Sequence, residues 1–221
     1  MTKSTTIAID GPAACGKTTI GRLLAKKLGY RFVDTGAWYR ALTWEALRVG
    51  VDVEDEAALG KLAAGTKIEP APDTDEGIIV NSRYINVELR TPEVDFGVSP
   101  VAKVAAVRKV MVREQQRIAK GGRVVMVGRD IGTNVLRDAG LKIYLDVSVE
   151  EQARRRYREI IDSGGKAEYD DILTGLVHRD KIDSKRAVNP LKKADDAHLI
   201  DTDKLGIQDV LGEVLELMDK R

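Results

Sequence analysis

The sequence of 221 residues contains a single cysteine, so no disulfide can form within the chain. A chain that does not rely on disulfides is typical of a reducing compartment, and we expect the cytoplasm. Long apolar runs are also missing: the first hydrophobic stretch, Ile7-Ala8-Ile9, is too short for a signal peptide or a membrane span. We therefore expect neither a disulfide-stapled scaffold nor a membrane partner.

The chain has almost no excess of either charge, since 36 Lys and Arg residues face 35 Asp and Glu residues. Proteins that bind nucleic acid usually carry a basic surplus, so we expect no nucleic-acid partner. Internal repeats and low-complexity segments are absent as well. Hydrophobic residues make up 43% and charged residues 32% of the chain, which is the balance of a globular protein.

Short apolar segments alternate with amphipathic segments. Apolar runs rich in Val and Ile favour parallel strands covered on both faces; they occur at residues 5–9, 31–33, 123–127, 142–146 and 198–200. Apolar residues recur at helical spacing in residues 17–28, 149–161 and 207–218. Ser148 and Glu151 have the spacing of a capping box at the start of the second helix. The alternation predicts an α/β fold with a doubly wound parallel sheet of about five strands.

Two regions interrupt the alternation. Residues 51–100 predict a small α+β insertion, with a helix at 56–62, a loop around Pro70 and Pro72, and strands at 78–80 and 84–87 joined by a turn at Asn81-Ser82. Residues 154–190 are helical and heavily charged around Gly164-Gly165, which is typical of a mobile lid. The remaining core would comprise about 1–50, 101–153 and 191–221, within a single domain spanning 1–221.

The strongest chemical signal is Gly11-Pro12-Ala13-Ala14-Cys15-Gly16-Lys17-Thr18, which matches G-x-x-x-x-G-K-[ST] between a predicted strand and a predicted helix. In such a phosphate loop, or P-loop, backbone amides cradle nucleotide phosphates and the helix N-terminus adds partial positive charge. We expect Lys17 to reach the β- and γ-phosphates of a nucleotide and Thr18 to hold Mg²⁺, with Thr19 also at the nucleotide. Cys15 is either an acidified, oxidation-sensitive thiol or simply a small residue that fits.

Charged residues follow two further predicted strands. Asp34, Thr35 and Arg40 come after the second strand, and Arg129 and Asp130 follow the third. Ligands of doubly wound sheets collect at the carboxyl ends of the strands, so we expect these side chains to face the same crevice as the P-loop. Two arginines there suit a second phosphate group. Surface ion pairs are the alternative for either motif alone.

With these motifs the chain resembles the bacterial cytidylate kinases, and the likeness covers nearly its whole length. It is carried by Ile9-Asp10-Gly11-Pro12, Asp34-Thr35-Gly36-Ala37-Trp38-Tyr39-Arg40, Arg90-Thr91-Pro92-Glu93-Val94, Gly128-Arg129-Asp130-Ile131-Gly132-Thr133, Arg154-Arg155-Arg156-Tyr157, Arg179-Asp180 and Asp183-Ser184-Lys185-Arg186-Ala187. The P-loop is shared by many NTPases, whereas the block at 128–133 is far more specific. The resemblance implies a monomer with the P-loop NTPase fold, a monophosphate-binding insertion and a lid.

The resemblance also implies the reaction, which is Mg²⁺-assisted transfer of a phosphoryl group from ATP to CMP or dCMP. Thr35, Arg40, Arg129 and Arg186 would hold the CMP phosphate, with Asp34 nearby. Ser99, Arg108 and Asp130 would read the cytosine, and Arg179 and Asp183 would contact the sugar. The catalytic set would be Lys17, Arg129, Asp130, Arg155 and Arg156, the last two being lid arginines that approach the transferred group.

Other functions stay open at this point. The acceptor could be UMP, AMP or a small hydroxyl compound, or the chain could be a nucleotide-binding regulator without turnover. The lid arginines could form a solvated basic helix face. The chain also departs from the family's commoner pattern: Ala13-Ala14-Cys15 replaces Ser-Gly-Ala, Thr18-Thr19 replaces Gly-Thr, and Ile182 stands where an arginine is frequent.

Overall fold

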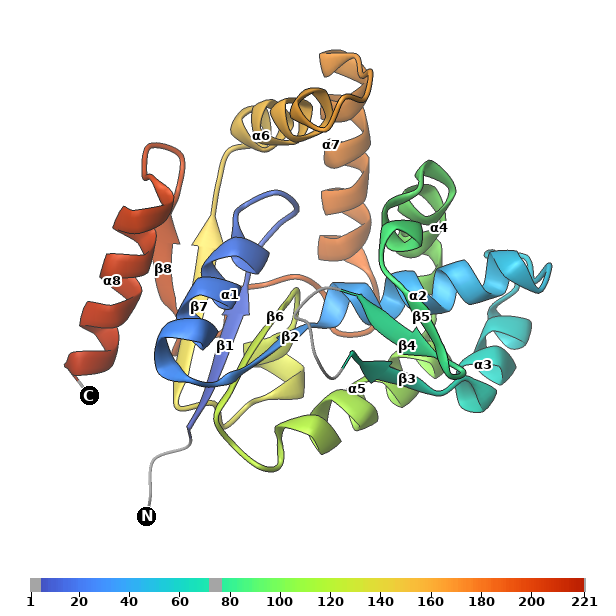
Figure 1. The fold of residues 1–221 in the computed structure, drawn as a ribbon, viewed down its shortest axis with the longest axis horizontal. Coiled ribbons are helices and arrows are strands. Elements are labelled where there is room, and N and C mark those ends of the chain that lie inside the picture. The colour runs from blue at the N-terminus through green and yellow to red at the C-terminus, as the bar shows by residue number, and fades with distance from the viewer. Residues whose placement is uncertain (1–4, 72–76, 221) are drawn as a thin grey trace. The chain divides into compact units, whose positions relative to one another are not determined.

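A computed structural model describes residues 5–71 and 77–220 of the chain (Figure 1). It divides into two compact units, a first unit of residues 1–31 and 123–221 and a second unit of residues 32–122. Pro72, which was expected in a loop, lies outside the described residues. The boundaries proposed for the core, the insertion and the lid stay predictions.

The main sheet has five strands in the order β2-β6-β1-β7-β8. Their bounds are β1 (Thr6–Asp10), β2 (Arg31–Asp34), β6 (Val124–Gly128), β7 (Leu141–Asp146) and β8 (His198–Asp201). Strand β1 runs parallel to β6 and β7, and β7 runs parallel to β8. Every residue of β1 and of β6 is buried, which explains why these strands are almost continuous apolar runs. The predicted doubly wound α/β fold is confirmed.

The register of the central strands aligns their carboxyl ends. Asp10, the last residue of β1, lies opposite Gly128 on β6 and Tyr144 on β7. The loops that follow β1 and β6 therefore leave the sheet next to each other. This places the P-loop beside the Arg129-Asp130 segment within the first unit.

Three helices of the first unit lie where apolar spacing predicted them: α1 (Lys17–Leu28), α6 (Val149–Asp162) and α8 (Ile207–Asp219). Helix α7 (Tyr169–Lys185) lies in the charged region that was expected to be helical, and the short π-helical turn η2 (Ile131–Val135) was not predicted. Helix α1 packs against β6 and α8 and buries Ile20 and Leu24. Within the described ranges, no helix is long and apolar enough to cross a membrane.

Helices α6 and α7 form a helical hairpin at the position predicted for the lid (Figure 1). The turn between them includes Gly164, whose φ of 81° lies in the left-handed region that favours glycine. A buried cluster joins Ala153 of α6, Leu176 of α7 and Ala13 of the P-loop. The hairpin is thus packed against the loop that is expected to hold ATP.

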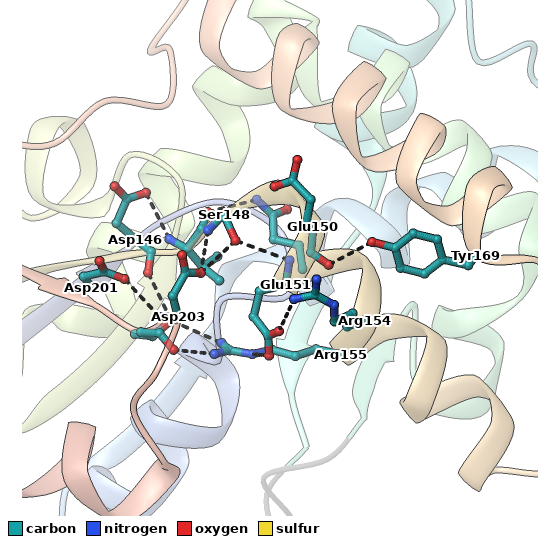
Figure 2. A network of polar contacts seen from close by, with 12 residues as sticks. Asp146, Ser148, Glu150, Glu151, Arg154, Arg155, Tyr169, Asp201 and Asp203 are labelled. Atoms are coloured by element: carbon teal, nitrogen blue, oxygen red, sulfur yellow. Dashed lines mark hydrogen bonds and ion pairs between the residues drawn. The ribbon is translucent and has the colours of Figure 1, made fainter.

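The capping box predicted for α6 is only half formed. The Ser148 hydroxyl accepts a hydrogen bond from the amide of Glu151 at 3.4 Å, as expected. The reciprocal bond is absent, because the Ser148 amide donates to Asp203 at 2.8 Å instead (Figure 2). The Glu151 carboxylate pairs with two arginines of its own helix rather than with the helix start.

The second unit is built from helices and a small antiparallel sheet of order β3-β4-β5. Its elements are α2 (Thr35–Arg48), α3 (Glu56–Gly65), β3 (Ile68–Pro70), β4 (Ile78–Val80), β5 (Arg83–Ile85), the 3₁₀ helix η1 (Val87–Arg90), α4 (Pro92–Lys103) and α5 (Ala105–Ala119). The prediction of a loop at Pro70 was wrong. Pro70 is the last residue of the edge strand β3, where the missing N–H of proline is tolerated. The strand expected at 84–87 ends at Ile85, because Val87 begins η1.

The hairpin turn predicted at Asn81-Ser82 is confirmed. Asn81 has φ 47° and Ser82 has φ 70°, which is the left-handed pair required at the centre of a type I′ turn. The Asn81 side chain accepts from the amide of Lys67 at 3.0 Å and donates to Glu45 at 3.1 Å. Asn81 is therefore fixed by contacts, whereas Ser82 is exposed and holds its left-handed backbone without glycine.

We predict that Ser82→Gly stabilises the protein by about 0.5 kcal/mol, because removal of Cβ relieves a left-handed cost of roughly 1–2 kcal/mol while added chain entropy offsets part of it. The free energy of unfolding in urea measures the change. Ser184→Gly is the matched control: Ser184 is an exposed residue of α7, where glycine should destabilise by about 0.5 kcal/mol. Destabilisation by both variants would contradict the assignment of strain to Ser82.

Candidate active site

The P-loop lies between β1 and α1, as the motif requires. Gly11 has φ 153°, and a Cβ at this position would come within 2.2 Å of the Leu145 carbonyl oxygen, so only glycine fits. Gly16 has φ 93° and precedes α1 without any side-chain cap, which leaves the first amides of the helix directed toward the loop. Loop and helix start together form the arrangement that binds anionic groups in proteins.

Lys17 is buried and folds back over the loop. Its ammonium group donates to the Pro12 carbonyl and lies 3.3 Å from the Cys15 sulfur. The other residues expected at the nucleotide differ in exposure: Pro12, Ala13 and Cys15 are buried, Ala14 and Thr18 are half-buried, and Thr19 is exposed. Ala14 has φ 51°, so a non-glycine residue occupies the left-handed region inside the loop.

Four charged side chains of the first unit form a compact network after β6 and along α7. Arg129 donates to Asp183 at 2.8 Å, and Arg186 donates to Asp130 at 3.1 Å. Arg186 also lies 3.8 Å from Asp183, which joins the two pairs. The structure thus brings together four of the residues predicted to bind the acceptor nucleotide.

The charges of this network hold one another ionised. Burial raises the pKa of the Asp183 carboxyl, but three surrounding arginines outweigh burial and hold this pKa below its usual range. These arginines are Arg129, Arg179 and Arg186. Burial likewise opposes the charge of Arg129, yet Asp183 outweighs it and raises the arginine pKa. Asp183 is therefore a charged acceptor and Arg129 a charged donor at neutral pH.

Two polar residues to which the sequence assigned no role contact the same segment. Asp10 accepts hydrogen bonds from the amides of Ile131 and Gly132, each at 2.7 Å. Asn134 donates from its side chain to Asp130 at 3.1 Å. Neither contact has a local sequence signal, since Asp10 lies more than a hundred residues before its partners and Asn134 lies in an unpredicted π-helical turn. A polar residue next to a P-loop is the only hint that the sequence offers.

Burial raises the pKa of Asp10 to about 6, although the hydrogen bonds from Gly132 and Ile131 act in the opposite direction. Asp130 raises this pKa further, while Lys17 lowers it. Asp10 is consequently mostly ionised at neutral pH, despite being only 3% exposed.

The lid arginines are engaged in contacts of their own. Arg155 donates to Glu151 at 3.1 Å and to both the hydroxyl and the carbonyl of Thr202, which follows β8 (Figure 2). Arg156 pairs with Glu159 at 2.9 Å on the same helix. Arg179 lies half-buried on α7, one residue before Asp180, whose carboxylate accepts from the Ala13 amide at 3.5 Å. The C-terminal part of α7 therefore contacts the P-loop.

The second unit holds the other residues predicted to bind substrate. Asp34 caps α2 by accepting from the Gly36 amide at 2.9 Å, and Thr35 is buried beside it. Arg40 pairs with Asp95 and donates to the Leu89 carbonyl at 2.9 Å. Burial lowers the pKa of Arg40, and Asp95 counteracts this effect in part.

The two remaining base-reading candidates lie on consecutive helices of the second unit. Ser99 is on α4 and Arg108 on α5, and both are buried. The Arg108 guanidinium donates to the Ala102 carbonyl at 3.2 Å and lies 5.4 Å from the centre of the Tyr39 ring. Aromatic stacking and the carbonyl contact hold a guanidinium in a fixed orientation.

Comparisons with known proteins identify the family of the chain. The family model for cytidylate kinase matches residues 7–220. The cytidylate kinase of Bacillus pumilus (strain SAFR-032) is 50% identical over 222 residues, covering 100% of this chain and 98% of that protein. The cytidylate kinase of Bacillus subtilis (strain 168) is 45% identical over 222 residues, covering 100% and 99%.

Among solved structures, the shikimate kinase from Acinetobacter baumannii in complex with shikimate matches with a TM-score of 0.50 and 20% identity, covering 99% of this chain and 94% of that chain. At this identity the match shows the fold alone, which is that of the P-loop NTPases. The match of the family model to residues 7–220 and the relatives at 45–50% identity over the full length show the family. The chain belongs to the cytidylate kinase family and is a phosphotransferase, a nucleoside monophosphate kinase.

Proposed function

We propose that this enzyme transfers the γ-phosphoryl group of ATP to CMP and dCMP, which yields ADP and CDP or dCDP. The observation that carries the proposal is the alignment of two loops at one edge of the sheet. Register places Asp10, before the P-loop, opposite Gly128, before Arg129 and Asp130. A donor phosphate and an acceptor phosphate would therefore lie on adjacent strand ends, as phosphoryl transfer requires.

The donor side consists of the P-loop amides, the start of α1 and Lys17. The fit to ATP with Mg²⁺ is good, because α1 begins without a side-chain cap and Thr18 presents a hydroxyl on its first turn. Mg²⁺, when bound by Thr18 and the ATP phosphates, supplies neutralisation of phosphate charge. Lys17 would exchange its contact with the Pro12 carbonyl for a phosphate oxygen and stabilise charge on the moving group.

The acceptor side consists of arginines held by carboxylates. Arg129 and Arg186 are each paired with an aspartate, so their guanidinium groups are already oriented for a phosphate. In the second unit Thr35 and Arg40 are proposed to bind the same phosphate, with Asp34 fixing the start of their helix. Asp183, ionised in this setting, would accept a hydrogen bond from a sugar hydroxyl, with Arg179 beside it.

Cytosine would be selected over uracil by hydrogen bonding. Asp130 and Ser99 can accept from the amino group of cytosine, while Arg108 can donate to its N3 and O2 atoms. Uracil would present a carbonyl to the Asp130 carboxylate and an N–H to the Arg108 guanidinium, which leaves polar groups mismatched. Each such mismatch costs roughly 1–3 kcal/mol when the groups are buried.

The lid would contribute charge and exclude water. Arg155 and Arg156 now bind Glu151, Thr202 and Glu159, and these contacts must be exchanged for the transferring phosphoryl group. The Arg156–Glu159 pair is exposed on its Glu159 side (63%), and ion pairs of this kind stabilise by only about 0–1 kcal/mol, so a phosphate with two or more negative charges competes well for Arg156. Arg155 must leave half-buried contacts, which a phosphate has to replace with equally strong ones. The acceptor phosphate is itself anionic and needs no strong general base. Exclusion of water prevents ATP hydrolysis.

Two alternatives are distinguished by experiment. The acceptor could be another monophosphate, UMP or AMP, or the chain could bind nucleotides as a regulator without turnover.

We also propose that the enzyme is a monomer and that it acts in the cytoplasm.

We predict turnover restricted to CMP and dCMP when purified enzyme is given ATP, Mg²⁺ and each of CMP, dCMP, UMP, AMP and GMP. A coupled assay of ADP release gives kcat and KM for each acceptor. Faster turnover of UMP or AMP would keep the kinase and remove the base-reading assignment. ATP binding without turnover of any acceptor would favour the regulator.

We predict that Asp130→Asn lowers the ratio of kcat/KM for CMP over UMP about tenfold or more, because an amide can donate to the uracil carbonyl as well as accept from the cytosine amino group. The ratio is insensitive to loss of active protein, since both substrates use the same preparation. Asp196→Asn is the matched control, an exposed aspartate of the same unit paired with Lys142. A ratio in Asp130→Asn equal to that of the control would exclude Asp130 from base reading.

We predict that Arg155→Ala lowers kcat about 100-fold with little change in the KM for CMP, because it removes a donor to developing charge. Arg154→Ala is the matched control, since Arg154 is the preceding residue, shares Glu151 and is 56% exposed. Its kcat should stay within about twofold of wild type. Steady-state kinetics at saturating ATP give kcat for both variants. An equal loss of kcat in Arg155→Ala and in Arg154→Ala would mean that Arg155 acts only through the stability of α6.

A further inference from the structure

The Asp10 carboxylate lies at the junction of two functional loops. It is the last side chain of β1, immediately before Gly11 of the P-loop, and it is 3% exposed. Its Oδ1 accepts from the Ile131 amide and its Oδ2 from the Gly132 amide, each at 2.7 Å. Distances this short are those of charge-assisted hydrogen bonds.

These two amides are the first of η2, and their own turn cannot satisfy them. The N-cap of η2 is Asp130, and its side chain makes no capping bond. The Asp130 carboxylate instead accepts from Arg186 and Asn134, each at 3.1 Å. Asp10 therefore replaces the missing cap from another strand and releases the Asp130 side chain for other contacts.

The backbone around Arg129 and Asp130 is consequently fixed on both sides. Before them, Gly128 is held in the β1–β6 ladder opposite Asp10 itself. After them, the amides of Ile131 and Gly132 are held by the Asp10 side chain. One residue thus defines both ends of the segment from which these two side chains project.

This arrangement requires a carboxylate, because two adjacent amides need two acceptor oxygens on one side chain. Asparagine has the same shape but one oxygen, and its amide nitrogen would face a backbone N–H. Gly132 leaves little room beside this contact: a Cβ there would lie 3.1 Å from Lys142 Cδ, which is tight, and 3.4 Å from Asp10 Oδ2, which is van der Waals contact.

We propose that Asp10 is a positioning residue that fixes the start of η2 and thereby aims the Arg129-Asp130 pair at the acceptor nucleotide. The inference rests on the proposed function, since it assigns these two side chains to the acceptor. Asp10 touches neither nucleotide in this role, and its link to the donor side is a charge interaction with Lys17, the smallest of the influences on its pKa. Its loss should therefore weaken the acceptor side much more than the donor side.

The test is Asp10→Asn, with binding measured separately from turnover. We expect the dissociation constant for CMP, measured by calorimetry without ATP, to rise about tenfold or more, as loss of a charge-assisted hydrogen bond predicts. The CMP over UMP ratio of kcat/KM should fall as well. The affinity for a non-hydrolysable ATP analogue should stay within about twofold. Amide hydrogen exchange at residues 131 and 132, followed by NMR, should become faster.

Two further variants keep the result interpretable. Gly132→Ala places a Cβ 3.1 Å from Lys142 Cδ and in contact with Asp10 Oδ2, so η2 must shift by a few tenths of an ångström unless Lys142 moves. Such a shift should raise the CMP dissociation constant in the same direction, even if Asp10→Asn does not fold. Val214→Ala removes buried volume from α8, remote in sequence from η2, and should lower stability without changing the CMP over UMP ratio.

The outcomes separate this inference from the proposed function. If wild-type enzyme neither binds nor phosphorylates CMP, the proposed function fails, and the same comparison is made with the monophosphate that it does bind. If wild-type enzyme uses CMP but Asp10→Asn binds it within twofold of normal, the positioning role is overturned. Equal losses of affinity for CMP and for the ATP analogue would also overturn it, because they would show a general effect on the P-loop.

Discussion

The pairing of β1 with β6 is the constraint on which the rest of the site depends. Both strands are buried along their whole length, so their register is strongly specified. A slip of one residue would turn Asp10 to the opposite face of the sheet and take its carboxylate away from η2. It would also displace the P-loop from the Arg129-Asp130 segment. The chemistry at the sheet edge is therefore a consequence of which apolar residues of two strands lie opposite each other.

The charges at this edge hold one another in fixed orientations. Burial of ion pairs is weak evidence for stability, because desolvation offsets much of the attraction. Their concentration at the ends of β6 and α7 is better explained by orientation. Arg129 and Arg186 already have their guanidinium groups fixed by Asp183 and Asp130. If a phosphate binds these arginines, as proposed, it meets donors that lose little further side-chain entropy, which is the physical content of preorganisation.

Local patterns in the sequence predicted the parts of the structure that depend on neighbouring residues. Buried parallel strands, the amphipathic helices of the first unit, the P-loop and the Asn81-Ser82 turn all have a short-range signal. Helices α4 and α5 were not predicted. Pro100 lies inside α4, so propensity is overridden there by packing against α2. In α5 eight apolar residues are interspersed with five charged ones, and the helix packs against α3.

The contacts that could not be predicted join residues distant in the chain. The hydrogen bond from the Ser148 amide to the Glu151 carboxylate, which would complete the capping box, does not form. The Ser148 amide donates instead to Asp203, which lies in the segment after β8. The Asp10 contacts with η2 have the same character. Such contacts are decided by the strand order, which the periodicity of single segments does not determine. Sequence reasoning could therefore name Arg129 and Asp130 but not the residue that holds their backbone.

The altered interior of the P-loop shows how tertiary contacts can compensate for a lost glycine. Ala14 adopts φ 51°, a conformation that costs an L-residue roughly 1–2 kcal/mol and that the glycine usual in the family would adopt freely. The cost is sustained because the preceding residue makes two contacts: Ala13 packs against Ala153 and Leu176, and its amide donates to Asp180. Helices α6 and α7 thus brace the loop in its curved form. Alanine has fewer accessible backbone conformations than glycine in the unfolded chain, but at a positive φ this gain is smaller than the strain that alanine introduces, so the loop depends on these contacts for its shape.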